Sequence, residues 1–71
     1  MVQWSLSSIL SVTNCYCLVL SAHPGHNELV NTHIAISMRN VLYARELPGG
    51  VFRVEMVNGL QLDIQPLTPV L

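Results

Sequence analysis

The sequence predicts a small α+β protein in which residues 41–66 form an antiparallel β-meander, preceded by an apolar N-terminal segment. Over most of residues 41–65, apolar and polar side chains alternate, and Pro-Gly-Gly and Asn-Gly interrupt the alternation with residues that favour tight turns. The first 27 residues contain no Asp, Glu, Lys or Arg, and a helix is one of the conformations open to them. We therefore divide the chain into an uncharged segment at 1–22, a turn with a short helix at 23–40, the meander at 41–66 and a tail at 67–71.

Length and charge limit the classes of function. A chain of 71 residues makes one small domain at most, and a domain of this size buries only about 60% of its unfolded surface. A membrane, a partner or a metal would add needed stability. Charged residues make up 10% of the chain, against about 25% in an ordinary domain. With three Arg, no Lys and a net charge of −1, the chain is not a strongly basic nucleic-acid binder.

Residues 1–22 are compatible with four interpretations. A secretory signal would use the apolar run at 15–20 and the small residues Ser21 and Ala22 for cleavage, but no basic residue precedes the run. A transmembrane helix would have about the required ~20 residues, diluted by Ser, Thr and Asn. A transit peptide would be Ser-rich, as here, but would also carry Arg. In the fourth interpretation the segment is part of a globular core that includes Trp4, Leu6, Ile9 and Leu10.

Four residues with metal-binding chemistry follow in the pattern C-x-C-x5-H-x2-H: Cys15, Cys17, His23 and His26. Zinc accepts Cys and His ligands, but its sites usually space two cysteines by two to four residues. We expect no metal here, with both cysteines buried as small apolar residues and a turn at Pro24-Gly25 carrying solvated histidines. No catalytic triad or carboxylate pair is evident, so we expect no enzymatic activity and no cofactor.

Residues 23–40 have an ambiguous periodicity. Asn27 and Glu28 are suited to a helix start. A helix would place four apolar residues on one face: Val30, Ile34, Met38 and Val41. A strand would instead use the alternation of Ile34 and Ile36. We predict a helix over residues 27–38, with His33 partly exposed.

The meander contains three strands and two turns. Residues 41–47 form the first strand, and the turn residues Pro48, Gly49 and Gly50 end it. The second and third strands place alternate residues on one apolar face: Phe52, Val54, Met56, Leu60, Leu62 and Ile64. Pro66 ends regular pairing.

The turn at Asn58-Gly59 fixes the register of the last hairpin. A two-residue loop would set Glu55 against Leu62 and mix charge into the apolar face. A loop of residues 57–59 instead sets Val54 against Leu62 and Arg53 against Asp63, with Gly59 in the left-handed conformation. Because a slip of one residue would expose every apolar side chain, we predict the three-residue loop.

The stretch LPGGVFRVEMVNG, residues 47–59, resembles the segment LPNxMFRVELENG of bacterial and plastid translation initiation factor one. The matching residues are Leu47, Pro48, Phe52, Arg53, Val54, Glu55, Asn58 and Gly59. The resemblance extends at most over residues 41–65. It departs from the family at Leu60, where the family has histidine, and the family's basic stretch has no counterpart in the residues that follow.

The resemblance implies a fold and a partner. Members of that family are small oligonucleotide-binding barrels that sit on RNA of the small ribosomal subunit, so the meander would resemble part of such a barrel, with Arg53 and Arg45 facing phosphates. The implied function is a non-enzymatic RNA- or ribosome-binding module, truncated or degenerate, in the cytoplasm or a plastid. The alternative is a small membrane-associated or secreted protein without catalytic activity, whose partner is a membrane or another protein. The oligomeric state stays open.

Charge limits the RNA affinity that the resemblance implies. Glu55 and Asp63 lie near Arg53 in the predicted hairpin and would repel phosphate while pairing with the guanidinium. Three cations allow a salt dependence no steeper than about −2 to −3 on a log–log plot. We therefore predict weak binding or none to ribosomal RNA.

Overall fold

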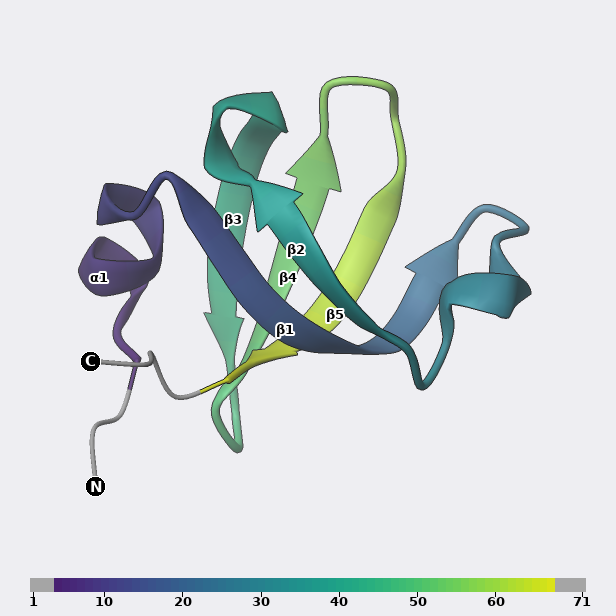
Figure 1. Ribbon diagram of the computed structural model, residues 1–71, viewed down its shortest axis with the longest axis horizontal. Coiled ribbons are helices and arrows are strands. Elements are labelled where there is room, and N and C mark those ends of the chain that lie inside the picture. Colours follow the sequence, from purple (N-terminus) through teal and green to yellow (C-terminus); the bar gives the residue numbers. More distant parts are fainter. Residues whose placement is uncertain (1–3, 68–71) are drawn as a thin grey trace.

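Five antiparallel strands form one sheet, in the order β2-β1-β5-β4-β3, in a computed structural model that describes residues 4–67 (Figure 1). One short α-helix precedes the sheet, and two short 3-10 helices, η1 and η2, flank β2. The elements in chain order are α1 (Leu6–Ser11), β1 (Asn14–His23), η1 (Asn27–Leu29), β2 (His33–Ser37), η2 (Met38–Asn40), β3 (Val41–Leu47), β4 (Val51–Met56) and β5 (Gln61–Pro66). The sequence predicts a small α+β protein with a meander, and the structure is a small β-rich fold with one α-helix.

β1 is the longest strand and joins the two parts of the sheet. Its first half pairs with β2 and its second half with β5. The pairing with β5 shifts between Val19 and Ser21, and a β-bulge of this kind bends a strand and increases its twist. Figure 1 shows the result: β1 and β2 pass in front of the meander, and α1 lies beside β3. The sheet therefore curls around its own apolar side.

The core is formed by the inward side chains of the curled sheet and one residue of α1. Its fully or nearly fully buried members are Ile9, Cys15, Cys17, Val19, Ala22, Ile36, Phe52, Val54, Leu62 and Ile64. Among the described residues no polar or charged residue is buried. α1 is capped by Ser5, whose hydroxyl accepts from the Ser8 N–H while the Ser8 hydroxyl accepts from the Ser5 N–H. Such reciprocal capping compensates for the short length of the helix.

The predicted meander is present, and the predicted register of its last hairpin is confirmed. Val54 lies opposite Leu62, and Arg53 lies opposite Asp63. The Met56 N–H donates to the Leu60 carbonyl at 2.8 Å, and Gly59 has a φ of 90°. The three-residue loop therefore keeps Phe52, Val54, Leu62 and Ile64 together on the buried face.

The helix predicted over residues 27–38 is wrong. Only a 3-10 turn forms at its start, and β2 occupies most of the remaining residues. β2 forms because Ile34 and Ile36 pair with Cys17 and Cys15 on β1. This pairing stabilises alternating apolar residues in a strand and does not depend on their helical spacing.

The N-terminal residues divide between α1 and the centre of the sheet. Ile9 is buried in the core, with Trp4 and Leu6 packed against it, whereas Leu10, also expected in the core, is 52% exposed. The α1 helix has six residues. Within residues 4–67, no helix is long and apolar enough to cross a membrane.

Candidate functional site

The outward side chains of the meander form the surface that the sequence singles out. Because Phe52, Val54 and Leu62 face the core, the residues that alternate with them point outward. We call this surface the meander face and define it by six residues: Tyr43, Arg45, Arg53, Glu55, Gln61 and Asp63. It brings together the two arginines that the resemblance implies as phosphate contacts.

A row of charges crosses the meander face from β3 to β5. Arg45 on β3 is directly opposite Arg53 on β4, and Arg53 is directly opposite Asp63 on β5. Directly opposite residues of antiparallel strands lie on one face with their side chains in reach of each other. The register therefore places two guanidinium groups and one carboxylate side by side.

Asp63 holds Arg53 through two hydrogen bonds. The Arg53 Nε donates to Asp63 Oδ1 at 2.8 Å, and Nη2 donates to Oδ2 at 3.1 Å. This bidentate geometry fixes both the distance and the plane of the guanidinium. These hydrogen bonds lower the pKa of Asp63 and raise the pKa of Arg53. Ser21 lies opposite Asp63 on β1, and the Arg53 guanidinium makes the largest contribution to lowering the pKa of this carboxylate.

Arg45 is the less engaged of the two arginines. It is exposed, and among residues 4–67 it forms no ion pair and no side-chain hydrogen bond. Tyr43 precedes Arg45 on the same face of β3, with 48% of its surface exposed, and it lies opposite Glu55. The sequence emphasised Arg53 more than Arg45, whereas the structure leaves Arg45 with the freer guanidinium.

Arg39 is a further cation, to which the sequence assigned no role. It is exposed in η2 at the start of β3. A hydrogen bond from the Val57 N–H to the Asn40 carbonyl, at 2.8 Å, connects η2 with the loop after β4. Arg39 thus lies at one end of the meander, outside the row formed by Arg45 and Arg53.

The predicted turn residues shape the ends of the meander. Gly49 and Gly50 have φ values of 81° and 76° between β3 and β4, a conformation that other residues rarely adopt. Asn58 Oδ1 accepts a hydrogen bond from the Leu60 N–H at 3.0 Å and stabilises the second turn. These residues hold the register that places Arg45, Arg53 and Asp63 in one row.

The Cys and His residues of the N-terminal half are separated by the fold. Cys15 and Cys17 are both buried on the inner face of β1, whereas His23, the last residue of β1, and His26, in the turn after it, are exposed. A hydrogen bond with Cys15, together with burial, raises the pKa of the Cys17 thiol. Within residues 4–67, no group of three or more His, Cys, Asp or Glu side chains is arranged to hold a metal ion.

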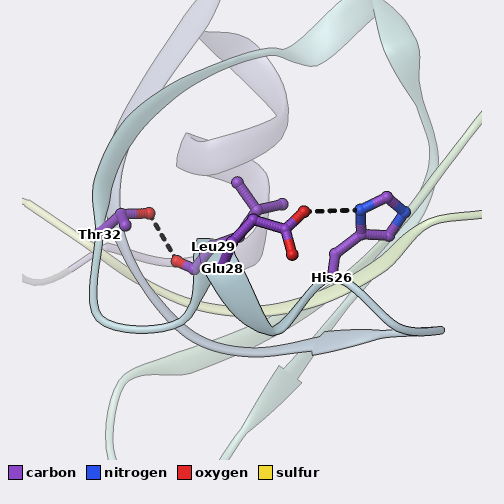
Figure 2. A network of polar contacts seen from close by, with 4 residues as sticks. All are labelled: His26, Glu28, Leu29 and Thr32. Carbon is purple, nitrogen blue, oxygen red and sulfur yellow. Dashed lines mark hydrogen bonds and ion pairs between the residues drawn. The ribbon is translucent and has the colours of Figure 1, made fainter.

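His26 instead belongs to a surface turn. Its Nδ1 lies 3.2 Å from Glu28 Oε1, and the Thr32 hydroxyl donates to the Leu29 carbonyl (Figure 2). Backbone hydrogen bonding and the contact with His26 lower the pKa of Glu28. These contacts order the connection between β1 and β2, and His33, as expected, is exposed on β2.

Comparisons with protein-family models, with curated proteins and with solved structures find no match. Function is therefore inferred from the residues of the chain itself.

Proposed function

We propose that this chain is a non-enzymatic RNA-binding module of low affinity, and that the meander face contacts the RNA. The observation that carries the proposal is the direct juxtaposition of Arg45 and Arg53 on neighbouring strands. Like charges directly opposite each other destabilise a sheet. A phosphate between the two guanidinium groups would relieve their repulsion, and local conflicts of this kind are typical of functional sites.

The partly neutralised state of Arg53 leaves room for one phosphate. Asp63 uses Nε and Nη2 of Arg53, so the remaining Nη1 donors and the guanidinium of Arg45 are open to an anion. Arginine matches phosphate geometry because its donors form a planar fork. We place the phosphate of an RNA strand between these two side chains.

Tyr43 supplies the contact to a base. It is next to Arg45 on the same face and is half exposed. A base can stack on such a ring without sequence preference, and each stacked base contributes about 1–3 kcal/mol in single-strand binders. Single-stranded RNA fits this surface better than a duplex, whose bases are already stacked.

The resemblance to translation initiation factor one supports the choice of RNA. The matched residues 47–59 form β4 and the turns at both of its ends, and in that family the corresponding hairpin belongs to a barrel that binds ribosomal RNA. The matched strand is the second in the family and the fourth here. Because the strand order differs, we carry over from the family only the local hairpin and its partner, small-subunit RNA of the decoding site.

Affinity is limited by the acidic neighbours. Asp63 competes with the RNA phosphate for Arg53, and Glu55 lies beside Tyr43 on the surface that the RNA strand would cross. We expect a dissociation constant above about 10 µM at physiological salt, with a log–log salt slope no steeper than about −2 to −3.

The test is a titration of labelled single-stranded decoding-site RNA at about 0.15 M salt, with three matched arginine variants. Arg45→Gln and Arg53→Gln each remove one cation from the meander face, whereas Arg39→Gln removes one outside it. We expect Arg45→Gln to weaken binding about tenfold, Arg53→Gln to weaken it less, and Arg39→Gln to leave it within about twofold. Absence of binding, or equal losses in all three variants, would contradict the proposal. Submicromolar binding that disappears in Arg53→Ala would contradict the predicted low affinity.

A further inference from the structure

An apolar strip runs along the outside of β1. The apolar outward residues of this strand are Tyr16, Leu18 and Leu20, of which Tyr16 is 64% and Leu20 is 37% exposed. Ala35 on β2 lies opposite Tyr16. On the other side, the Leu67 N–H donates to the Tyr16 carbonyl at 2.9 Å, which continues the pairing between β1 and β5. We call these five residues the β1 strip.

The sequence of β1 is that of a strand covered on both faces. A strand with one solvated face alternates apolar and polar residues, whereas residues 15–20 are apolar without interruption. Cys15, Cys17 and Val19 fill the core on one face. Among the described residues, no element covers Tyr16 or Leu20 on the other. The chain thus presents a second apolar surface on β1, an interior strand of its sheet.

We propose that a second copy of this chain covers the β1 strip, so that the protein is a face-to-face dimer. The strip is its own complement because none of its five residues is charged, so it brings no like charges together when two copies meet. A two-fold axis near Leu18 would set Tyr16 of one copy against Leu20 of the other, a large side chain against a smaller one. Such an arrangement is isologous and closed, with the two sheets about 10 Å apart.

The surroundings of the strip favour this partner over a lipid surface. Proteins that lie on membranes carry Lys or Arg around the apolar residues. The side chains that flank Leu18 are instead His33 and Gln65, neither of which is Lys or Arg. An interface of ordinary size buries about 800 Å² per subunit, about a sixth of the 4658 Å² surface. The strip would form the apolar centre of that interface, and His33 and Gln65 would form part of its polar rim.

The dimer does not depend on the proposed function. The β1 strip is centred on β1, which passes in front of β3 and β4 (Figure 1), whereas Arg45 and Arg53 of the meander face belong to β3 and β4. Dimerisation would leave Arg45 and Arg53 open and would place two meander faces on one particle.

The test is the molar mass of the full chain by sedimentation equilibrium, from about 1 µM to about 1 mM. Leu20→Lys and the milder Tyr16→Ser change the strip, and Val57→Lys is the matched control because Val57 is 58% exposed outside the strip. We expect a reversible dimer whose dissociation constant rises more than tenfold in both strip variants and stays unchanged in the control. Far-UV circular dichroism verifies that each variant is folded, and Tyr16→Ser decides the matter if Leu20→Lys is not.

Three results would overturn the proposal. The first is a monomer at every concentration. The second is a dimer that survives both strip variants or is lost in Val57→Lys. The third is a monomer that floats with phosphatidylcholine vesicles and loses this binding in Tyr16→Ser, because a lipid surface would then be the occupant of the strip.

Discussion

Replacing Gly59 with Val tests the turn on which the register of the meander depends. Gly59 has a φ of 90° and closes the loop between β4 and β5. No atom beyond its chain neighbours lies within 4 Å of the position that a Cβ would take. A side chain therefore meets no steric obstacle there, and the effect of the substitution isolates the cost of the backbone conformation.

The expected cost follows from that conformation. The left-handed region costs roughly 1–2 kcal/mol for a residue with a Cβ, and a β-branched residue fits it especially poorly. We expect Gly59→Val to reduce the free energy of unfolding by about 1–2 kcal/mol. The whole domain, at 71 residues, should have about 4–11 kcal/mol, so the loss is a substantial fraction of its stability.

Urea unfolding followed by circular dichroism measures this loss. With a slope of about 1 kcal/mol/M for a small chain, the midpoint should fall by about 1–2 M. Gly59→Asn is the matched control, because asparagine adopts positive φ more readily than valine, and its midpoint should fall less. Equal midpoints for the wild type and Gly59→Val would show that the loop does not require a left-handed residue at this position.

Three further predictions concern the pair, the core and the N-terminal region. Arg53 lowers the folded-state pKa of Asp63 below its usual value of 3.8, so the stabilisation by this pair is present above that value and is lost as the pH falls through the folded pKa, where the unfolded state binds more protons. In urea unfolding at several pH values, Asp63→Asn should lose less stability on acidification than the wild type. An equal loss of stability in the two proteins would contradict the assignment. Phe52 is the largest fully buried side chain, so Phe52→Ala should cost about 3–5 kcal/mol and remove most of the unfolding transition, whereas a midpoint like that of the wild type would place Phe52 outside the core. The Trp4 indole donates to the Leu67 carbonyl at 2.8 Å and is partly buried, so iodide should quench its fluorescence only in part, and complete quenching with and without lipid would contradict this packing.

The meander could be predicted because its information is local. Turn residues and strict alternation lie within one short stretch, and the requirement that Val54 and Leu62 share a buried face leaves one register for the second hairpin. The same reasoning applied to Pro48-Gly49-Gly50 would have paired Leu47 with Val51 and hence Arg45 with Arg53, as the structure has them. The position of Arg45 opposite Arg53 could therefore have been predicted from the sequence.

The rest of the fold depends on contacts between distant residues. The choice between a helix and a strand at Ile34 and Ile36 is made by Cys17 and Cys15, which lie about twenty residues earlier in the chain. The position of β1 between β2 and β5 could not be predicted either, because an uninterrupted apolar run is compatible with a strand, a signal segment or a buried helix. Periodicity alone does not separate these outcomes.

The most direct test of the RNA-binding proposal is a nuclear magnetic resonance titration of the labelled chain with single-stranded decoding-site RNA. The meander face predicts that the largest shift changes occur at the backbone amides of Tyr43, Arg45 and Arg53, together with the Arg45 Nε resonance, because these groups surround the proposed phosphate position. Tyr16 and Leu18, on the β1 strip, should change little. Shift changes concentrated on the β1 strip, or none at RNA concentrations approaching about 1 mM, would contradict the assignment of the meander face as an RNA-binding surface.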